Sequence, residues 1–255
     1  MTKTLPRDLT SYDLLKALAL VLMITDHVGH FFYPDEMWLR IMGRMCVPIW
    51  FFLIGFARTT EITRSLWIGG ALVAVSALIA GQYILPLNIL FTIIIIRLFR
   101  ERFVIAAFRS MDTLRGLFFI LFFLTFPTAL LFEYGAMGMM FALFGYAVRN
   151  MEDVSKRVDV IYLRIYAAAA LFSYYLWQGV IMPHVSIDQA LVFAAGLVVV
   201  GVILWRFKPV VYTGGEFFVA RSFIRIFQFM GRRTLEIYVA HVILFRLVCI
   251  YLYPE

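Results

Sequence analysis

The sequence carries little charge: Asp, Glu, Lys and Arg together make up 15% of its 255 residues, against 63% hydrophobic residues. In an average soluble domain about a quarter of the residues are charged and about half are apolar. No polar stretch exceeds the length of a loop, which leaves no room for a separate soluble domain. The composition therefore predicts an all-α, polytopic integral membrane protein, with one domain over residues 1–255.

Cysteine is scarce as well. Cys46 and Cys249 both lie in apolar segments, and their spacing is not that of a metal site. We expect buried small residues at these positions, leave a disulfide between them open, and expect no bound metal. The net charge of +7 comes from basic residues that interrupt apolar segments without forming a patch, which argues against nucleic-acid binding.

Long apolar runs dominate the rest of the chain, and there is no internal repeat. Nine of these runs are long enough, or nearly so, to cross about 30 Å of hydrocarbon at about 1.5 Å per residue. With the N-terminus in the cytoplasm and the C-terminus outside, every Lys and Arg except Arg40, Arg44 and Arg246 falls toward the inner side, as the positive-inside rule requires. The predicted spans are 12–32, 36–57, 65–83, 85–98, 113–132, 134–149, 160–178, 187–205 and 232–253.

The stretch EFFVARSFIRIFQFMGRR does not fit a span. Arg221, Arg225, Gln228 and Arg232 recur at helical spacing on one face, with Phe and Ile on the others. This pattern predicts an amphipathic cytoplasmic helix near residues 216–230. Its arginines either anchor the protein on anionic lipid or help to hold a phosphate-bearing ligand.

Ionisable residues interrupt the first span in the stretch MITDHVGHFF. A charge in the hydrocarbon costs several kcal/mol, about 3 on the mildest scales, so Asp26 needs a reason to be there. Helical spacing lets His30 share a face with Asp26 or with His27, and Arg44 of the second span is expected at a similar depth. These residues would supply a general base and a charge-stabilising group, but a structural ion pair would use the same ones.

The last span carries His241 and, one turn earlier, Tyr238. His241 lies about 12 Å along the helix from Arg233, in the cytoplasmic half, whereas His27 lies in the outer half. We therefore expect the two histidines at different depths, so that only one level holds the chemistry. A single histidine on an apolar helix is more often a hydrogen-bonded core residue than a catalyst.

The first two spans resemble the opening of the TraX family, whose name comes from the inner-membrane enzyme that acetylates the N-terminus of F pilin. The resemblance lies in SYDLLKALALVLMITDHVGHFF and in RIMGRMCVPIWFFLIGFAR. The closing MGRRTLEIYVAHVILF is similar to the last helix of that family and to the end of the wider membrane acyltransferases, with Thr234 where a Ser is usual. Together these motifs cover about the first 60 and the last 25 residues.

The resemblance implies transfer of an acetyl group, in the bacterial inner membrane, from cytoplasmic acetyl-CoA to an amine or hydroxyl on the outer side, in a pilin N-terminus or a glycan. His27 would be the base or would itself be acetylated, Asp26 would orient it, and Arg44 would polarise the thioester. His30, Tyr238 and His241 would line the substrate path. The residues expected to hold the phosphates of the coenzyme are Lys16, Arg58, Arg97, Arg100, Arg225, Arg232 and Arg233.

Two other functions use the same residues. In a proton-coupled transporter, Asp26 and His27 would form an intramembrane relay, but related halves or broken helices, which are common in such proteins, are not evident in the sequence. In a non-catalytic assembly protein the buried polar residues would have no evident purpose. Binding of coenzyme A separates the enzyme from both alternatives.

Overall fold

The computed structural model describes residues 8–182, 184–212 and 221–252, and this part of the chain is mostly helical. Two short strands, β1 (Leu9–Thr10) and β2 (Val211–Tyr212), pair antiparallel and join the start of the first helix to the segment after α10. The helices are α1 (Ser11–Phe32), α2 (Met37–Arg44), α3 (Cys46–Phe56), α4 (Arg64–Ile79), α5 (Ile89–Ala107), α6 (Met111–Ala129), α7 (Met137–Arg149), α8 (Met151–Val154), α9 (Val160–Ile181), α10 (Ile187–Trp205), α11 (Arg221–Arg232) and α12 (Thr234–Leu252).

Six helical stretches of the described residues are long and apolar enough to cross a membrane: α1, α2 with α3, α6, α9, α10 and α12. They indicate a multi-pass membrane protein. The other three predicted spans overlap α4 and α7, which are 16 and 13 residues long, and α5, whose second half is charged. Because these three helices do not reach the same length and apolarity, the count of nine spans and the orientation stay predictions.

The second predicted span is divided at Met45 into α2 and α3. Pro48 has no backbone N–H, so it cannot donate to the carbonyl oxygen of Arg44, four residues earlier. The hydroxyl of Tyr174, from α9, donates to that oxygen instead, over 2.9 Å. The proline therefore frees an acceptor that ties α2 to α9 at the level of Arg44.

The middle of the molecule is a close pairing of α3 with α7. A Cβ added at Gly55 would lie 1.7 Å from the carbonyl oxygen of Ala142, and one at Gly145 would lie 2.0 Å from that of Phe52. Only glycine lets the two backbones approach this far, as is common between membrane helices. Fully buried phenylalanines, including Phe51 and Phe141, fill the space beside this contact.

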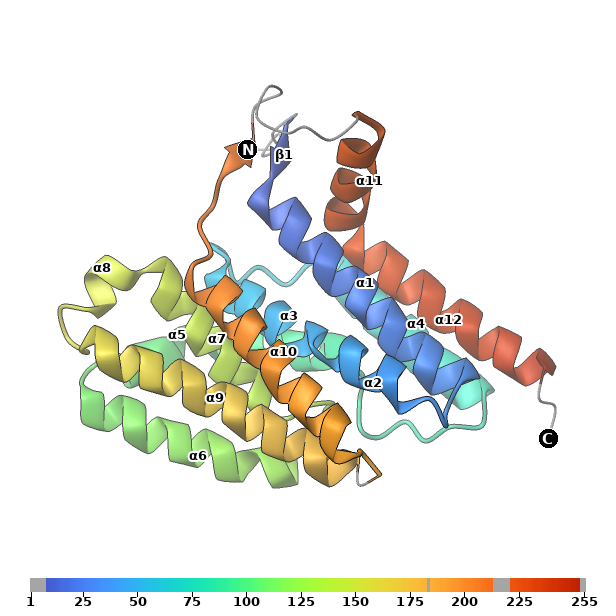
Figure 1. Cartoon of the computed structure of the whole chain (residues 1–255), viewed down its shortest axis with the longest axis horizontal. Coiled ribbons are helices and arrows are strands. Elements are labelled where there is room, and N and C mark those ends of the chain that lie inside the picture. Colours follow the sequence, from blue (N-terminus) through green and yellow to red (C-terminus); the bar gives the residue numbers. More distant parts are fainter. Residues whose placement is uncertain (1–7, 183, 213–220, 253–255) are drawn as a thin grey trace.

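On the other side of the molecule α1 and α12 run side by side, and α11 packs against the first half of α1 (Figure 1). The described part of the predicted amphipathic helix corresponds to α11, and residues 216–220 lie outside the described residues. Phe223, Ile226 and Phe229 are exposed at one-turn intervals along it. Such an apolar face suits the membrane–water interface.

Candidate functional site

Two histidines that are 214 residues apart in the sequence meet between α1 and α12. His27 Nδ1 lies 2.6 Å from His241 Nε2, and the ring centroids are 4.9 Å apart. His241 is buried and His27 is half-buried. The contact joins the two ends of the chain at one point inside the helical bundle.

The hydrogen bonds fix which nitrogen of each neutral ring carries the proton. His241 Nδ1 lies 2.7 Å from the carbonyl oxygen of Ile237, which only accepts, so this nitrogen carries hydrogen. His241 Nε2 is then an acceptor, and His27 Nδ1 must donate to it. The remaining nitrogen, Nε2 of His27, is left with a free lone pair, the requirement for a general base.

The expectation that the two histidines occupy different depths is wrong. It took Arg233 as the surface end of the last span, whereas the backbone of Gly231 already abuts that of Asp13, inside the first turn of α1. Gly231 belongs to α11, and the helix is interrupted at Arg233 before α12 begins at Thr234, so a residue count from the surface does not give the depth of His241 along one helix. The distance of 2.6 Å between the two rings shows that they lie at the same level.

Tyr238 links this histidine pair to a pocket. Its buried ring lies 6.1 Å from that of His27 and 5.8 Å from that of His241. The ring also lines a pocket of about 330 Å³ whose walls come from α1, α3, α4, α5 and α12. Lys16 and Arg97, two of the residues predicted to hold the phosphates of the coenzyme, line the same pocket. The guanidinium of Arg97 also donates to the carbonyl of Glu61.

Asp26 points away from the histidines and into an ion-pair cluster. Its Oδ1 lies 2.9 Å from Arg40 and 3.2 Å from Arg44, and its side chain is 8% exposed. The predicted meeting of Asp26 with Arg44 is confirmed. Within the described residues, however, Asp26 makes no hydrogen bond or ion pair with His27, so the predicted role of orienting the imidazole has no direct bond to support it. The carboxylate instead neutralises two buried guanidinium groups.

Two residues hold the side chain of Arg44, Asp26 and Tyr134. Besides its ion pair with Asp26, its Nη1 donates to the hydroxyl of Tyr134 over 2.7 Å. Its guanidinium also lies 5.9 Å from the centre of that ring. Gly43 lets α2 lie close to α1, because a Cβ at this position would be 2.3 Å from the backbone nitrogen of Asp26. Because Asp26 and Tyr134 already hold its guanidinium, Arg44 suits a positioning role better than contact with a thioester.

Sequence reasoning missed three polar residues near this level. Arg40, one turn before Arg44, could have been found from the i, i+4 spacing that puts both on one face. Glu133, in the loop after α6, accepts from the backbone N–H of Ile89 over 2.9 Å, and burial raises the pKa of its carboxyl. Arg246 donates to the carbonyl of Val73 and the hydroxyl of Ser76. In the sequence, Arg246 stands out only as one of the three basic residues that fall toward the outer side.

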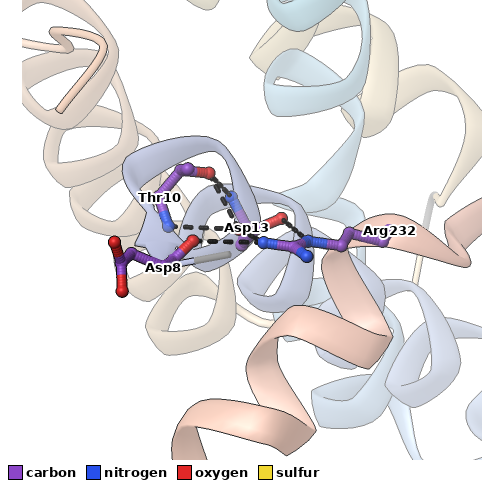
Figure 2. A network of polar contacts seen from close by, with 4 residues as sticks. All are labelled: Asp8, Thr10, Asp13 and Arg232. Atoms are coloured by element: carbon purple, nitrogen blue, oxygen red, sulfur yellow. Dashed lines mark hydrogen bonds and ion pairs between the residues drawn. The ribbon is translucent and has the colours of Figure 1, made fainter. Parts of the chain in front are cut away.

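Two of the arginines expected to bind the coenzyme are engaged within the protein. Arg100 is buried and donates to the carbonyls of Ile54 and Ala57 at the end of α3. Arg232 reaches from the end of α11 to both carboxylate oxygens of Asp13 and to the carbonyl of Asp8 (Figure 2). Asp13 also forms a capping box with Thr10, so this network secures the start of α1.

The other predicted site residues are open to the surroundings. Arg58 and Arg225 are exposed, and Arg233 forms an exposed ion pair with Glu236. His30 is exposed near the end of α1, where its ring packs against that of Phe31 at 4.9 Å. The structure thus brings together His27, Tyr238 and His241, puts Lys16 and Arg97 on the adjoining pocket, and leaves these four outside it.

No group of three or more His, Cys, Asp or Glu side chains suited to a metal ion occurs within the described ranges. Cys46 and Cys249 are both free thiols, which resolves the question of a disulfide between them.

Comparison with known proteins gives one family. The model of the TraX protein family matches residues 11–215. A segment of 85 residues is 34% identical to the uncharacterized protein RP591 of Rickettsia prowazekii (strain Madrid E). That segment is 33% of this chain and spans only 34% of the Rickettsia protein. No solved structure is significantly similar to this chain.

Proposed function

The chain belongs to the TraX family, and from this premise we propose that it is a membrane acetyltransferase that uses acetyl-CoA. The donor would enter from the cytoplasmic side of a bacterial inner membrane. The acceptor would be an amine or hydroxyl presented on the outer side, such as the N-terminus of a pilin or a sugar of a glycan. The proposal depends on the family and on what the histidine pair and its pocket are equipped to do.

The observation that carries the proposal is that one residue, Tyr238, adjoins both the pocket and the two histidines. Lys16 and Arg97 give the pocket two cations, and Tyr238 belongs both to its wall and to the surroundings of His27 and His241. A volume of about 330 Å³ lies at the lower end of the range for small-molecule sites. It suits the narrow thiol arm of a coenzyme, with the phosphates remaining at the basic residues.

The chemistry follows from the free lone pair on His27 Nε2. An acceptor amine attacks the thioester carbonyl carbon, a C–N bond forms, and the amine proton passes to His27 Nε2. The C–S bond then breaks, and the coenzyme leaves as a thiolate that takes this proton back from the imidazolium. His241 accepts the Nδ1–H of His27 throughout, so it shares the positive charge that develops on that ring.

The structure changes the roles that we assign to the neighbours. His241 becomes the partner that fixes the tautomer of His27, in place of a tunnel-lining residue. Asp26 and Arg44 become positioning residues that hold α1 against α2. Lys16 and Arg97 are the coenzyme contacts that we retain, because both line the pocket.

The test is turnover of labelled acetyl-CoA by the purified full-length protein. Wild type, His27→Gln and His184→Gln are incubated with radiolabelled acetyl-CoA, with and without a peptide amine, and release of free coenzyme A is followed. His184 is the matched control, because it is an exposed histidine in the loop after α9. We expect His27→Gln to lose about 10²–10⁴-fold in rate, the usual share of general base catalysis, and His184→Gln to retain full rate.

Binding of coenzyme A is measured on the same samples, since it distinguishes the alternatives. Thermal stabilisation of wild type by coenzyme A, weakened in Lys16→Gln, would support the donor pocket. Failure of coenzyme A to bind or turn over would contradict the proposal and favour a proton-coupled transporter. Full turnover by His27→Gln would contradict the assignment of the base alone.

A further inference from the structure

A second and larger hollow lies between α9 and α10, away from the histidine pair. Its volume is about 1150 Å³, and apolar side chains line most of it. Ala168, Ala194 and Gly201 keep it open, because their side chains are too small to fill the space between the two helices. Phe172 and Val198, on its rim, are 60% and 64% exposed, as expected of side chains that face lipid.

One end of this groove is basic. Arg164 lies in the second turn of α9, and Arg206 and Lys208 follow the end of α10, so all three cations line the same end. The guanidinium of Arg164 lies 5.7 Å from the ring centre of Trp205, which also lines the groove. No ion pair within the described ranges involves any of the three. Their charge is therefore available to an anion at the end of an apolar groove.

This end of the groove lies at the membrane surface that faces the start of α1. Lys208 leads into β2, which pairs with β1 directly before α1. The carbonyl of Lys208 also accepts from the hydroxyl of Ser11, the first residue of α1. The charge pattern of the sequence predicts that this surface is cytoplasmic. Figure 1 shows the ends of α10 and α9 that carry the cations on the same side of the molecule as the start of α1.

We propose that this groove binds an anionic phospholipid of the adjoining leaflet, with its phosphate at Arg164, Arg206 and Lys208 and an acyl chain between α9 and α10. An apolar channel with cations at the headgroup level is complementary to a lipid that carries a negative headgroup. The tryptophan beside the cations suits the same depth, because indole rings prefer the membrane interface. The site is separate from the proposed acetyl-transfer site and does not depend on it.

A second copy of the chain suits this groove less well. Two copies related by an axis along the membrane normal would present the same end of the groove to each other. The three cations of each copy would then face three cations of the other, which costs energy in an interface of low dielectric constant. An anionic lipid removes that repulsion.

The experiment titrates the full-length protein in neutral detergent with dioleoyl phosphatidylglycerol or with dioleoyl phosphatidylcholine. Thermal unfolding and native mass spectrometry report binding, and neither requires enzymatic activity. The groove variant is Arg164→Gln/Arg206→Gln/Lys208→Gln, and all three side chains are exposed. We expect phosphatidylglycerol to raise the Tm of wild type more than phosphatidylcholine does. The groove variant should bind phosphatidylglycerol about tenfold more weakly or worse, because each basic residue near an anionic surface contributes to binding.

Two further variants locate the lipid. The charge control is Arg102→Gln/Arg109→Gln/Arg157→Gln, which removes the same charge from exposed positions outside the groove and should keep the wild-type response. Ala168→Phe fills the groove from an exposed position and should weaken binding while the three cations stay in place.

Three results would overturn the proposal: equal shifts with the two lipids, equal losses in the charge control and the groove variant, or unchanged binding in Ala168→Phe. A lipid-free dimer that Ala168→Phe dissociates would assign the groove to a second copy instead.

Discussion

Replacing Asp26 by Asn tests whether this carboxylate holds the fold or takes part in the chemistry. The change keeps the size of the side chain and removes the charge between Arg40 and Arg44. Both ion pairs are short, at 2.9 and 3.2 Å, and the side chains of the acid and of each arginine are 8% and 14% exposed. Solvent therefore screens little of the repulsion that the variant leaves between the two guanidinium groups.

The expected cost is about 3–5 kcal/mol in the free energy of unfolding, the range for removing one partner of a buried pair. The assay is reversible unfolding in mixed micelles, followed by helical circular dichroism. Asp112→Asn is the control, because its ion pair with Arg115 is exposed and the change should cost no more than about 1 kcal/mol even though Asp112 lies in the first turn of α6. A double variant with Arg40→Gln should cost less than Asp26→Asn alone, since it removes one of the two unbalanced charges.

The reasoning would be refuted if Asp26→Asn unfolded like wild type but lost as much turnover as His27→Gln. The carboxylate would then act on the reaction through a contact that the described structure does not contain.

Two other changes test how α2 is held. Gly43→Ala should destabilise the protein, because the added Cβ would press on the backbone of α1. Gly116→Ala, whose added Cβ has nothing within 4 Å, should be neutral or stabilise the protein by up to about 1 kcal/mol. Thermal unfolding of both variants checks this. Tyr174→Phe should cost about 1–3 kcal/mol by leaving a buried carbonyl without its donor, and the same change should cost less in a Pro48→Ala background, where a backbone N–H becomes available. Equal costs of Tyr174→Phe in the two backgrounds would contradict that account.

The membrane class, the helical fold and the pairing of Asp26 with Arg44 could be predicted from the sequence. Hydropathy reports helices directly, and two buried opposite charges at similar depth have few other partners. The contact of His27 with His241 could not be predicted in this way. Counting residues along one helix fixes a depth only when the start of that helix is known, and the sequence does not show that the end of α11, just before α12, lies beside the first turn of α1.

The basic residues show a second limit of sequence reasoning. The sequence shows that most basic residues fall toward one predicted surface. It does not show which of their side chains are free to bind a ligand. Arg100 binds the carbonyls that end α3, and Arg232 binds Asp13. Arg97 lines the pocket but also donates to the carbonyl of Glu61. The groove between α9 and α10 left no signal in the sequence, because an alanine in an apolar helix looks the same at a groove and in a core.

The central claim is that His27 and His241 act as one catalytic unit in acetyl transfer. A double-mutant cycle on turnover of acetyl-CoA tests it most directly, with His27→Gln, His241→Gln and the variant that carries both changes. We predict that each single change lowers the rate and that the double variant is no slower than the slower single variant, because residues that act as a unit are not additive. Losses that multiply in the double variant, or full activity in His241→Gln, would contradict the account.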